Sequence, residues 1–292
     1  MKIGLFAGLA SPFATRDVVL ALARGADERG FHSIWLGEHV LLFDEYRSRY
    51  PYSEEGRLPG SAENGMLEQF TALSFMAAVT SRIRLATGIC LVPQRNPIYT
   101  AKEVAAVDWL SGGRFDFGVG VGWLEEEFQA LGVPFERRGA RCRDYLALMK
   151  KLWSEPVAEH ASEFWRLPKS YQDPKPLQQP HPPIHFGGES DAALKRVADL
   201  GQGWHGFSLQ PEGVAERLAA LERMLAERGR KRSEIEVTIC PYFTGIDLDK
   251  VKRYRDAGVD QVTILFFAPS PDLVEPTLDS LVEEILEPAR AL

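Results

Sequence analysis

The chain has 292 residues, and its 34 basic and 41 acidic side chains leave a formal net charge of −7. This acidic balance argues against non-specific nucleic-acid binding, which needs a basic surface. Cys90, Cys142 and Cys240 are far apart and form no CxxC pair, so neither a disulfide framework nor a zinc knuckle fits. No apolar run approaches the roughly 18 residues of a membrane span or forms a signal peptide. We therefore expect a cytoplasmic protein that binds neither nucleic acid nor a membrane.

Short apolar runs alternate with segments of helical spacing along nearly the whole chain. Eight runs predict strands, at residues 3–7, 33–36, 83–91, 114–121, 184–186, 203–207, 236–240 and 262–267. The remaining periodic segments predict helices, at residues 18–26 (ended by Gly30), 67–79, 98–110, 123–131, 141–153, 191–200, 214–228, 248–257 and 278–285. Two stretches interrupt the alternation: residues 43–65 are rich in Tyr, Gly, Pro and charge, and residues 156–183 are proline-rich and irregular.

Eight strands that alternate with helices are the number found in a TIM barrel, and strands that are apolar on both faces suit a parallel sheet covered by helices. We therefore predict an α/β fold, a (β/α)8 TIM-like barrel forming a single domain over residues 1–292. Residues 43–65 and 156–183 are its loop insertions. An open, doubly wound sheet is the alternative, but the chain has no P-loop, and its glycine runs do not match GxGxxG.

In a TIM barrel the functional residues lie just after each strand, at the C-terminal end of the barrel. His39 follows the second predicted strand. An imidazole there can act as an acid, a base or a hydrogen-bond donor, or it can only cap the strand end. The third strand closes on Thr87, Gly88 and Ile89. A glycine between β-branched residues indicates a bulge, the close approach of a ligand, or tight packing.

A pair of glycines between the fifth strand and the following helix is a candidate anion site. Gly187 and Gly188 free the backbone, and Ser190 or Asp191 can cap the helix. The N–H groups that follow then point outward, as they do where a helix N-terminus binds phosphate. An ordinary strand-to-helix turn with a cap would show the same pattern.

Aromatic side chains near two strand ends suit either of two roles. Trp123 follows the fourth strand, and Trp204 and His205 lie in the sixth. Each can pack against a flat ligand ring or fill the core of the barrel.

Charged and metal-ligating residues elsewhere favour simpler interpretations. The run Glu125-Glu126-Glu127 is interpreted as the solvated first turn of a helix, where acidic side chains favour the helix dipole. His181 and His185 flank two prolines in an extended segment. Four extended residues span roughly 13 Å, which is too far for one ion, so no metal site is expected.

The motifs together resemble the luciferase-like monooxygenase superfamily, in particular its branch of deazaflavin (F420)-dependent oxidoreductases. The resemblance covers essentially the whole chain, because its fragments keep their order and spacing. They are ERGFHSIWLGEH at 28–39, IRLATGI at 83–89, LSGGRF at 110–115, GVGVGW at 118–123, GVPFERR at 132–138, PIHFGG at 183–188 and LGQGW at 200–204.

The resemblance implies a barrel that binds a flavin or deazaflavin at its C-terminal end. It implies a non-prolyl cis peptide between Gly88 and Ile89 behind the cofactor ring, and His39 at the reactive edge of that ring. The phosphate would be bound by the glycine pair and the N–H groups that follow it. The cofactor-binding residues are then expected to be Ala7, His39, Thr87, Gly88, Ile89, Gly122, Trp123, Gly187, Gly188, Glu189, Ser190, Trp204 and His205, with His39 as the catalytic residue and no metal ligand.

The chain departs from the family pattern at Trp123, where sugar-phosphate dehydrogenases of this branch carry a catalytic Glu. This departure argues against a sugar-phosphate substrate and leaves the proton partner of His39 unnamed. The adjacent Glu38 is a poor candidate, since neighbouring residues of a strand point to opposite faces.

The resemblance implies hydride transfer between F420 and a small organic substrate, in a homodimer. An FMNH2-dependent monooxygenase on the same barrel is the first alternative. A non-catalytic flavin or deazaflavin carrier is the second.

Overall fold

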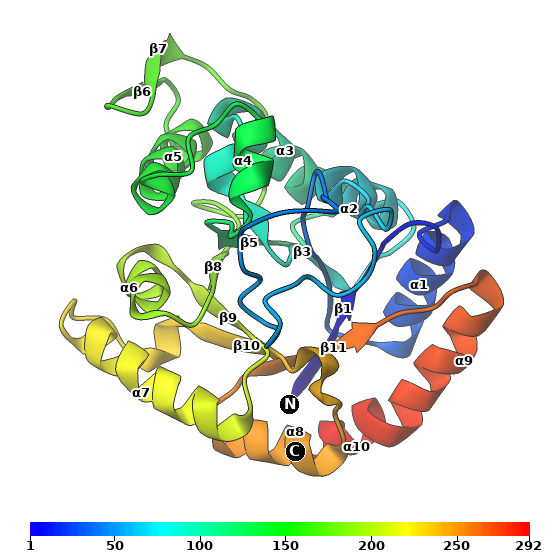
Figure 1. The fold of residues 1–292 in the computed structure, drawn as a ribbon. Coiled ribbons are helices and arrows are strands. Elements are labelled where there is room, and N and C mark those ends of the chain that lie inside the picture. Colours follow the sequence, from blue (N-terminus) through cyan, green and yellow to red (C-terminus); the bar gives the residue numbers. More distant parts are fainter.

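The computed structural model describes residues 1–292 and shows a closed parallel barrel, as predicted (Figure 1). Its strands run in the ring order β3, β2, β1, β11, β10, β9, β8, β5 and β4, and a further pairing of β3 with β5 closes the sheet. Their bounds are β1 (Lys2–Ala7), β2 (Ser33–Leu36), β3 (Arg84–Thr87), β4 (Cys90–Leu91), β5 (Phe115–Gly120), β8 (Ile184–Gly187), β9 (Gly203–Phe207), β10 (Glu236–Cys240) and β11 (Gln261–Phe266).

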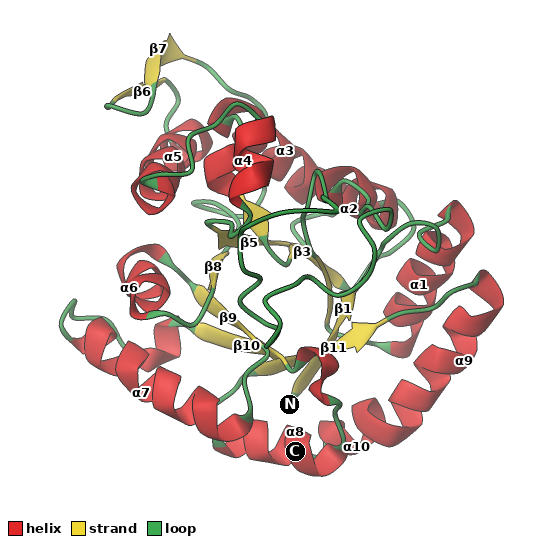
Figure 2. Cartoon of the chain, in the orientation of Figure 1, coloured by secondary structure: helices red, strands yellow, loops and turns green.

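Helices surround the strands on the outside of the barrel (Figure 2). They are α1 (Arg16–Arg29), α2 (Gln69–Ala77), α3 (Pro97–Leu110), α4 (Glu125–Ala130), α5 (Arg138–Ser154), α6 (Asp191–Leu200), α7 (Pro211–Ala226), α8 (Leu248–Asp256), α9 (Pro271–Leu281) and α10 (Glu287–Arg290). A cluster of 63 buried hydrophobic residues lies between these two layers and inside the ring. None of the helices is both long and apolar enough to cross a membrane.

Local sequence signals set the helix ends. Thr15 caps α1 through a hydrogen bond from the Val18 N–H, and Gly30 ends the same helix in the left-handed conformation at φ 80°. Ser190 caps α6 by accepting a hydrogen bond from the Ala193 N–H. Short polar side chains satisfy free N–H groups at a helix start, and glycine adopts positive φ without a steric penalty.

Two sequence-based predictions of strand structure need correction. The third strand is not continuous over residues 83–91: it breaks between β3 and β4, at Gly88 and Ile89, whose peptide bond is cis as the resemblance implied. The segment 156–183 is not irregular throughout. It contains an antiparallel hairpin of β6 (Ala158–Ala161) and β7 (Arg166–Ser170), which lies apart from the barrel strands in Figure 1. The prolines of this segment masked the hairpin, because proline is disfavoured inside a sheet.

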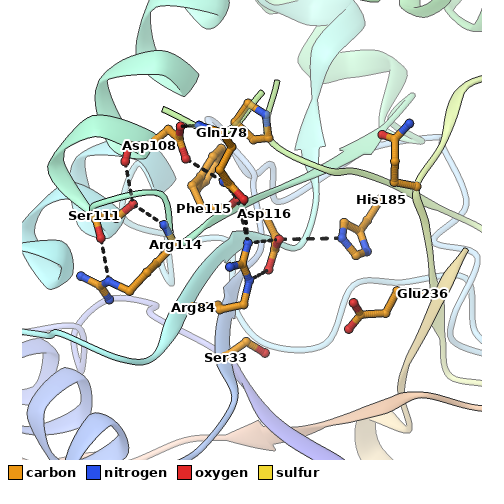
Figure 3. Close-up of polar contacts among 12 residues, drawn as sticks. Ser33, Arg84, Asp108, Ser111, Arg114, Phe115, Asp116, Gln178, His185 and Glu236 are labelled. Atoms are coloured by element: carbon orange, nitrogen blue, oxygen red, sulfur yellow. Dashed lines mark hydrogen bonds and ion pairs between the residues drawn. The ribbon is translucent and has the colours of Figure 1, made fainter. Parts of the chain in front are cut away.

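A network of polar side chains closes the N-terminal end of the barrel (Figure 3). Arg84 at the start of β3 donates two hydrogen bonds to the Asp116 carboxylate, at 2.6 and 2.7 Å. The His185 Nε2 atom lies 4.0 Å from the same carboxylate, and burial lowers the pKa of this imidazole. His185 is therefore part of the barrel floor.

The connection between β2 and α2 crosses the opposite, C-terminal end of the barrel (Figures 1 and 2). This segment, residues 37–68, contains the predicted insertion 43–65. Glu126 of α4 anchors it by accepting hydrogen bonds from the Arg47 N–H, at 2.6 Å, and the Ser48 hydroxyl, at 2.7 Å. The loop therefore covers the barrel mouth from a position fixed by α4.

Closure of the barrel depends on the absence of a side chain at Gly118. A Cβ atom there would lie 1.9 Å from the Thr87 carbonyl oxygen, where β3 and β5 approach each other. We expect Gly118→Ala to lower the free energy of unfolding by about 3 kcal/mol, since backbone must move to relieve the overlap. Urea denaturation followed by circular dichroism measures this loss. Gly8→Ala is the matched control, because nothing lies within 4 Å of a Cβ at Gly8, and an equal loss in both variants would contradict the explanation.

Candidate active site

A cavity of about 340 Å³ opens at the carboxyl ends of the barrel strands, within the usual size range of small-molecule sites. Phe6, Tyr52 and Tyr242 contribute aromatic walls from three separate parts of the chain. The predicted cofactor-binding residues that line it are His39, Gly88, Ile89, Gly122, Trp123, Gly187, Gly188, Glu189, Ser190 and His205. The structure thus brings most of the predicted site together in one cavity.

Three of the predicted residues do not line this cavity. Ala7 and Trp204 are buried in the hydrophobic core, because their strand neighbours Phe6 and His205 take the inward-facing positions. The Trp204 indole donates a hydrogen bond to the Gly188 carbonyl at 3.0 Å, so it supports the glycine turn from behind. Thr87 is fully buried and donates to the Gly118 carbonyl at 2.7 Å, within the barrel wall.

His39 is held by two partners, one on each ring nitrogen. Its Nδ1 atom lies 3.2 Å from a carboxylate oxygen of Glu127, and its Nε2 atom accepts a hydrogen bond from the Trp123 indole at 3.3 Å. An indole N–H can only donate, so Nε2 must be the acceptor and Nδ1 carries the proton. In this arrangement the ring is a neutral imidazole, and Glu127, which sequence reasoning did not identify, is the hydrogen-bond partner of its Nδ1 atom.

Glu127 is not a solvated helix residue, contrary to the prediction for the run 125–127. It is fully buried, and its second oxygen accepts hydrogen bonds from the N–H groups of Val40, at 2.6 Å, and Leu41, at 3.1 Å. Burial of a carboxylate requires such partners. A signal was present in the sequence: Glu127 stands beside Phe128, which with Leu124 forms an apolar pair four residues apart on the inward side of α4.

Glu38 does not share this role, although it lines the same cavity as His39 and does not point to the opposite face as predicted, because β2 ends at Leu36 and strand alternation no longer applies. Its carboxylate is paired with the Arg95 guanidinium and accepts a hydrogen bond from the Leu91 N–H at 2.6 Å. Burial raises the pKa of this carboxyl, while the Arg95 charge opposes that shift. Glu38 therefore joins the segment that follows β2 to β4 and to Arg95.

The opposite side of the cavity has the features of an anion site. Gly188 has a φ of 100°, which L side chains rarely adopt, and a Cβ there would lie 3.1 Å from Ala193. The N–H groups of Gly188 and Ser190 donate no hydrogen bond within the protein, although both residues line the cavity. Free N–H groups at the start of α6 favour a bound anion through both hydrogen bonding and the helix dipole.

Arg196 completes this side and was missed from the sequence. It lines the cavity, is only 8% exposed, and has no hydrogen bond or ion pair to any protein group. Burial lowers the pKa of its guanidinium, and the charges of Arg143 and Arg138 lower it further. The sequence did contain a signal: Arg196 lies about one and a half turns after Ser190 on α6. Helical side chains lean toward the N-terminus of their helix, so a long side chain at this position can reach back to the start of α6.

Glu189 links the anion side to the loop over the barrel mouth. Its carboxylate accepts hydrogen bonds from the Tyr52 hydroxyl, at 3.1 Å, and the Phe207 N–H, at 2.8 Å. Burial raises the pKa of Glu189 to about 7, and the two hydrogen bonds oppose that rise only in part. The residue is therefore able to exchange a proton near neutral pH.

His205 forms part of the cavity floor. Its ring stacks on Trp35 with a centroid separation of 4.6 Å and an interplanar angle of 22°. Burial lowers the pKa of His205 to about 3, and its Nε2 atom has no hydrogen-bond partner. A neutral imidazole with a free nitrogen can donate to or accept from a ligand, but it carries no charge there.

These features define the class of the protein: an α/β barrel with a ligand-sized cavity at the carboxyl ends of its strands. A family model for luciferase-like monooxygenases matches residues 3–261, and the chain belongs to this family. An uncharacterised protein of Mycobacterium tuberculosis (strain ATCC 25618 / H37Rv) is 31% identical over 250 residues, which are 86% of this chain and 85% of that protein. The oxygenase component of the flavin-dependent trigonelline monooxygenase of Acinetobacter baylyi is 34% identical over 170 residues, 58% of this chain and 42% of that protein.

Solved structures of two kinds share the fold. The monooxygenase RslO1 from Streptomyces bottropensis matches with a TM-score of 0.78 at 20% identity, covering 98% of this chain and 99% of that chain. The coenzyme F420-dependent tetrahydromethanopterin reductase from Methanopyrus kandleri matches with a TM-score of 0.75 at 17% identity, covering 98% of both chains. The predicted luciferase-like barrel is therefore confirmed, and the family includes oxidoreductases and monooxygenases.

The raised pKa of Glu189 predicts how stability changes with pH. The folded-state pKa of about 7 lies above the usual 4.5, so the native state binds this proton more tightly than the unfolded chain does. The protonated Glu189 carboxyl therefore contributes its full share of the free energy of unfolding below about pH 4.5. That contribution is lost as the pH rises through about 7. Glu189→Gln cannot ionise, so its free energy of unfolding relative to wild type should rise by about 1–3 kcal/mol between about pH 5 and pH 8.

Urea denaturation at a series of pH values measures this difference. Glu222→Gln on α7 is the control, because Glu222 is exposed and makes no hydrogen bond. A Glu189→Gln difference that stays constant across the pH range would show that the Glu189 carboxyl is ionised throughout.

Proposed function

We propose that the protein is an oxidoreductase that transfers a hydride between coenzyme F420 and a small organic substrate. One observation carries this proposal: the cavity joins an anion site without a counterion to a hydrogen-bonded imidazole at its other side. Gly188, Ser190 and Arg196 form the first, and His39 with Glu127 forms the second. A cofactor with a flat ring and a phosphate-bearing chain needs these two features in one cavity.

The residues present fit such a cofactor. The guanidinium of Arg196 and the free N–H groups of Gly188 and Ser190 would hold its phosphate. Gly88 and Ile89 would support one face of its ring from the gap between β3 and β4, where both residues line the cavity. When bound, a deazaflavin supplies two-electron hydride chemistry, so the protein contributes binding, orientation and polarity.

The chain's own residues can handle a proton beside this chemistry. Glu127 fixes the His39 ring and its tautomer, as carboxylates do for functional imidazoles. Nε2 of His39 is the atom that would face a substrate, and the Trp123 indole N–H occupies it in this structure. Trp123 must therefore turn away before His39 can accept or donate a proton there. The loop over the barrel mouth would exclude water from the cavity.

Support for F420 comes from chain length and from the sequence fragments quoted above. The F420-dependent reductase from Methanopyrus kandleri is matched over nearly its full length, whereas the trigonelline monooxygenase component is matched over less than half of its own. The RslO1 monooxygenase is also matched over its full length. An FMNH2-dependent monooxygenase is therefore the second candidate function.

Cofactor choice is tested by fluorescence titration of the cofactor-free protein with F420 and with FMN in parallel. We expect F420 to bind at least about tenfold more tightly. A companion variant, Gly188→Val, should weaken the binding of either cofactor strongly, because the positive φ and the nearby Ala193 exclude a side chain. Thermal unfolding of this variant is the control for its fold. Tight FMN binding without F420 binding would replace the proposal by the monooxygenase alternative.

The role of His39 is tested by His39→Ala. We expect turnover to fall by about 10²–10⁴-fold, the usual contribution of a general acid or base, while the cofactor dissociation constant changes little. The assay follows oxidation of the reduced cofactor with a panel of enones, imines and nitro compounds. His32→Ala is the matched control, since His32 precedes β2 at the other end of the barrel. Equal turnover of His39→Ala and wild type on every active substrate would contradict the assigned role.

A further inference from the structure

The N-cap and the first two turns of α5 carry a concentration of positive charge. Arg137, Arg138, Arg141 and Arg143 lie within seven residues, in a chain whose net charge is −7. The first turn of this 17-residue helix has no acidic residue and no side-chain cap. Cations at a helix N-terminus are disfavoured by the helix dipole. A negative group bound at this position would therefore be stabilising.

The protein supplies that negative group to only one of these arginines. Arg137 forms an ion pair with Glu163. Arg141 donates to the carbonyl oxygens of Pro134 and Glu136, at 2.5 and 2.9 Å, and so has no carboxylate partner.

The remaining two side chains also lack a counterion. Arg138 donates to the Gly122 carbonyl at 3.0 Å and lies over the Phe135 ring, 3.8 Å from its centroid. Arg143 is exposed and makes no hydrogen bond or ion pair. Burial lowers the pKa of Arg138, and the charge of Glu125 opposes this effect without forming an ion pair.

This cationic surface is continuous with the cavity. A Cβ at Gly139, in the first turn of α5, would lie 3.4 Å from an Nη atom of Arg196. The charges of Arg143 and Arg138 act on Arg196, since both lower its pKa. The first turn of α5 therefore lies against the Arg196 side chain, and Arg138 and Arg143 flank Gly139 on the same helix. We call Arg138, Arg143 and Arg196 the arginine cluster.

The cluster has more positive charge than one phosphate at the cavity wall needs. A phosphate bound by Arg196 and the α6 N-terminus would leave Arg138 and Arg143 without a counterion outside it. A ligand that satisfies all three must carry further anionic groups that continue from the cavity to the surface. FMN ends at its phosphate, whereas F420 continues past a phosphodiester into a chain of glutamates.

We propose that the arginine cluster binds the carboxylate tail of a deazaflavin cofactor, with Arg196 on its phosphodiester and Arg138 and Arg143 on the tail carboxylates. This inference rests on the proposed function and makes it more specific. The cluster then acts as a cofactor-selecting site outside the ring cavity. It provides a physical reason for preferring F420 over FMN that does not depend on the ring.

The experiment compares four ligands on the wild-type protein and on Arg143→Glu: F420 with a long glutamate tail, F420 with a single glutamate, the tail-free deazaflavin precursor F0, and FMN. Dissociation constants come from fluorescence titration at low and at high salt. We expect Arg143→Glu to weaken binding of long-tailed F420 by about three- to tenfold at low salt, because a surface attraction becomes a repulsion. Binding of F0 and FMN should stay unchanged, and high salt should reduce the difference.

Arg24→Glu is the matched control, because Arg24 is exposed on α1 and also has no partner. Arg196→Gln should weaken both forms of F420 and FMN but not F0, which has no phosphate. Equal binding of long-tailed F420 by wild type and Arg143→Glu would overturn the tail site while leaving the proposed function standing. A wild-type protein that binds FMN and no deazaflavin would overturn both.

Discussion

The buried carboxylate of Glu127 is the interaction on which the candidate site depends. One oxygen accepts the N–H groups of Val40 and Leu41, and the other faces the His39 ring. A carboxylate removed from water is stable only when its lone pairs are satisfied. Glu127 therefore fixes the chain just after β2, and the long loop over the barrel mouth begins from that point. The orientation of His39 follows from the same bond.

Charge is distributed unequally around the cavity. Glu127 contacts the imidazole of His39, Glu38 lines the cavity beside it, and each carboxylate has partners within the protein. Arg196, on the opposite side, has no partner within the protein, and a bound anion would offset the free-energy cost of its burial. Such an imbalance is typical of a site for an anionic ligand. The anionic group would bind beside Arg196, and the rest of the ligand would extend across the cavity toward His39.

Much of the fold was predictable because parallel strands buried on both faces form apolar runs that differ from the helical spacing around them. The eight runs mark the barrel strands, and the glycine pair before α6 marks the anion side. The hairpin of β6 and β7 was not predictable in this way, because Pro168 lies inside β7 and proline indicates a loop. Glu127 was misinterpreted for a different reason: its partner His39 is 88 residues away in sequence.

The sequence by itself determined the barrel, the end of it that carries the site, and most residues of the cavity wall, because local periodicity and strand ends are properties of short segments. Only the tertiary structure decided that Phe6 and His205, and not Ala7 and Trp204, face the cavity. It alone joined Trp123, His39 and Glu127, and it alone left Arg196 without a counterion. Which face a strand residue points to depends on the pairing register of the strands in the closed barrel. Hydrogen-bond partners depend on contacts between segments that are far apart in sequence.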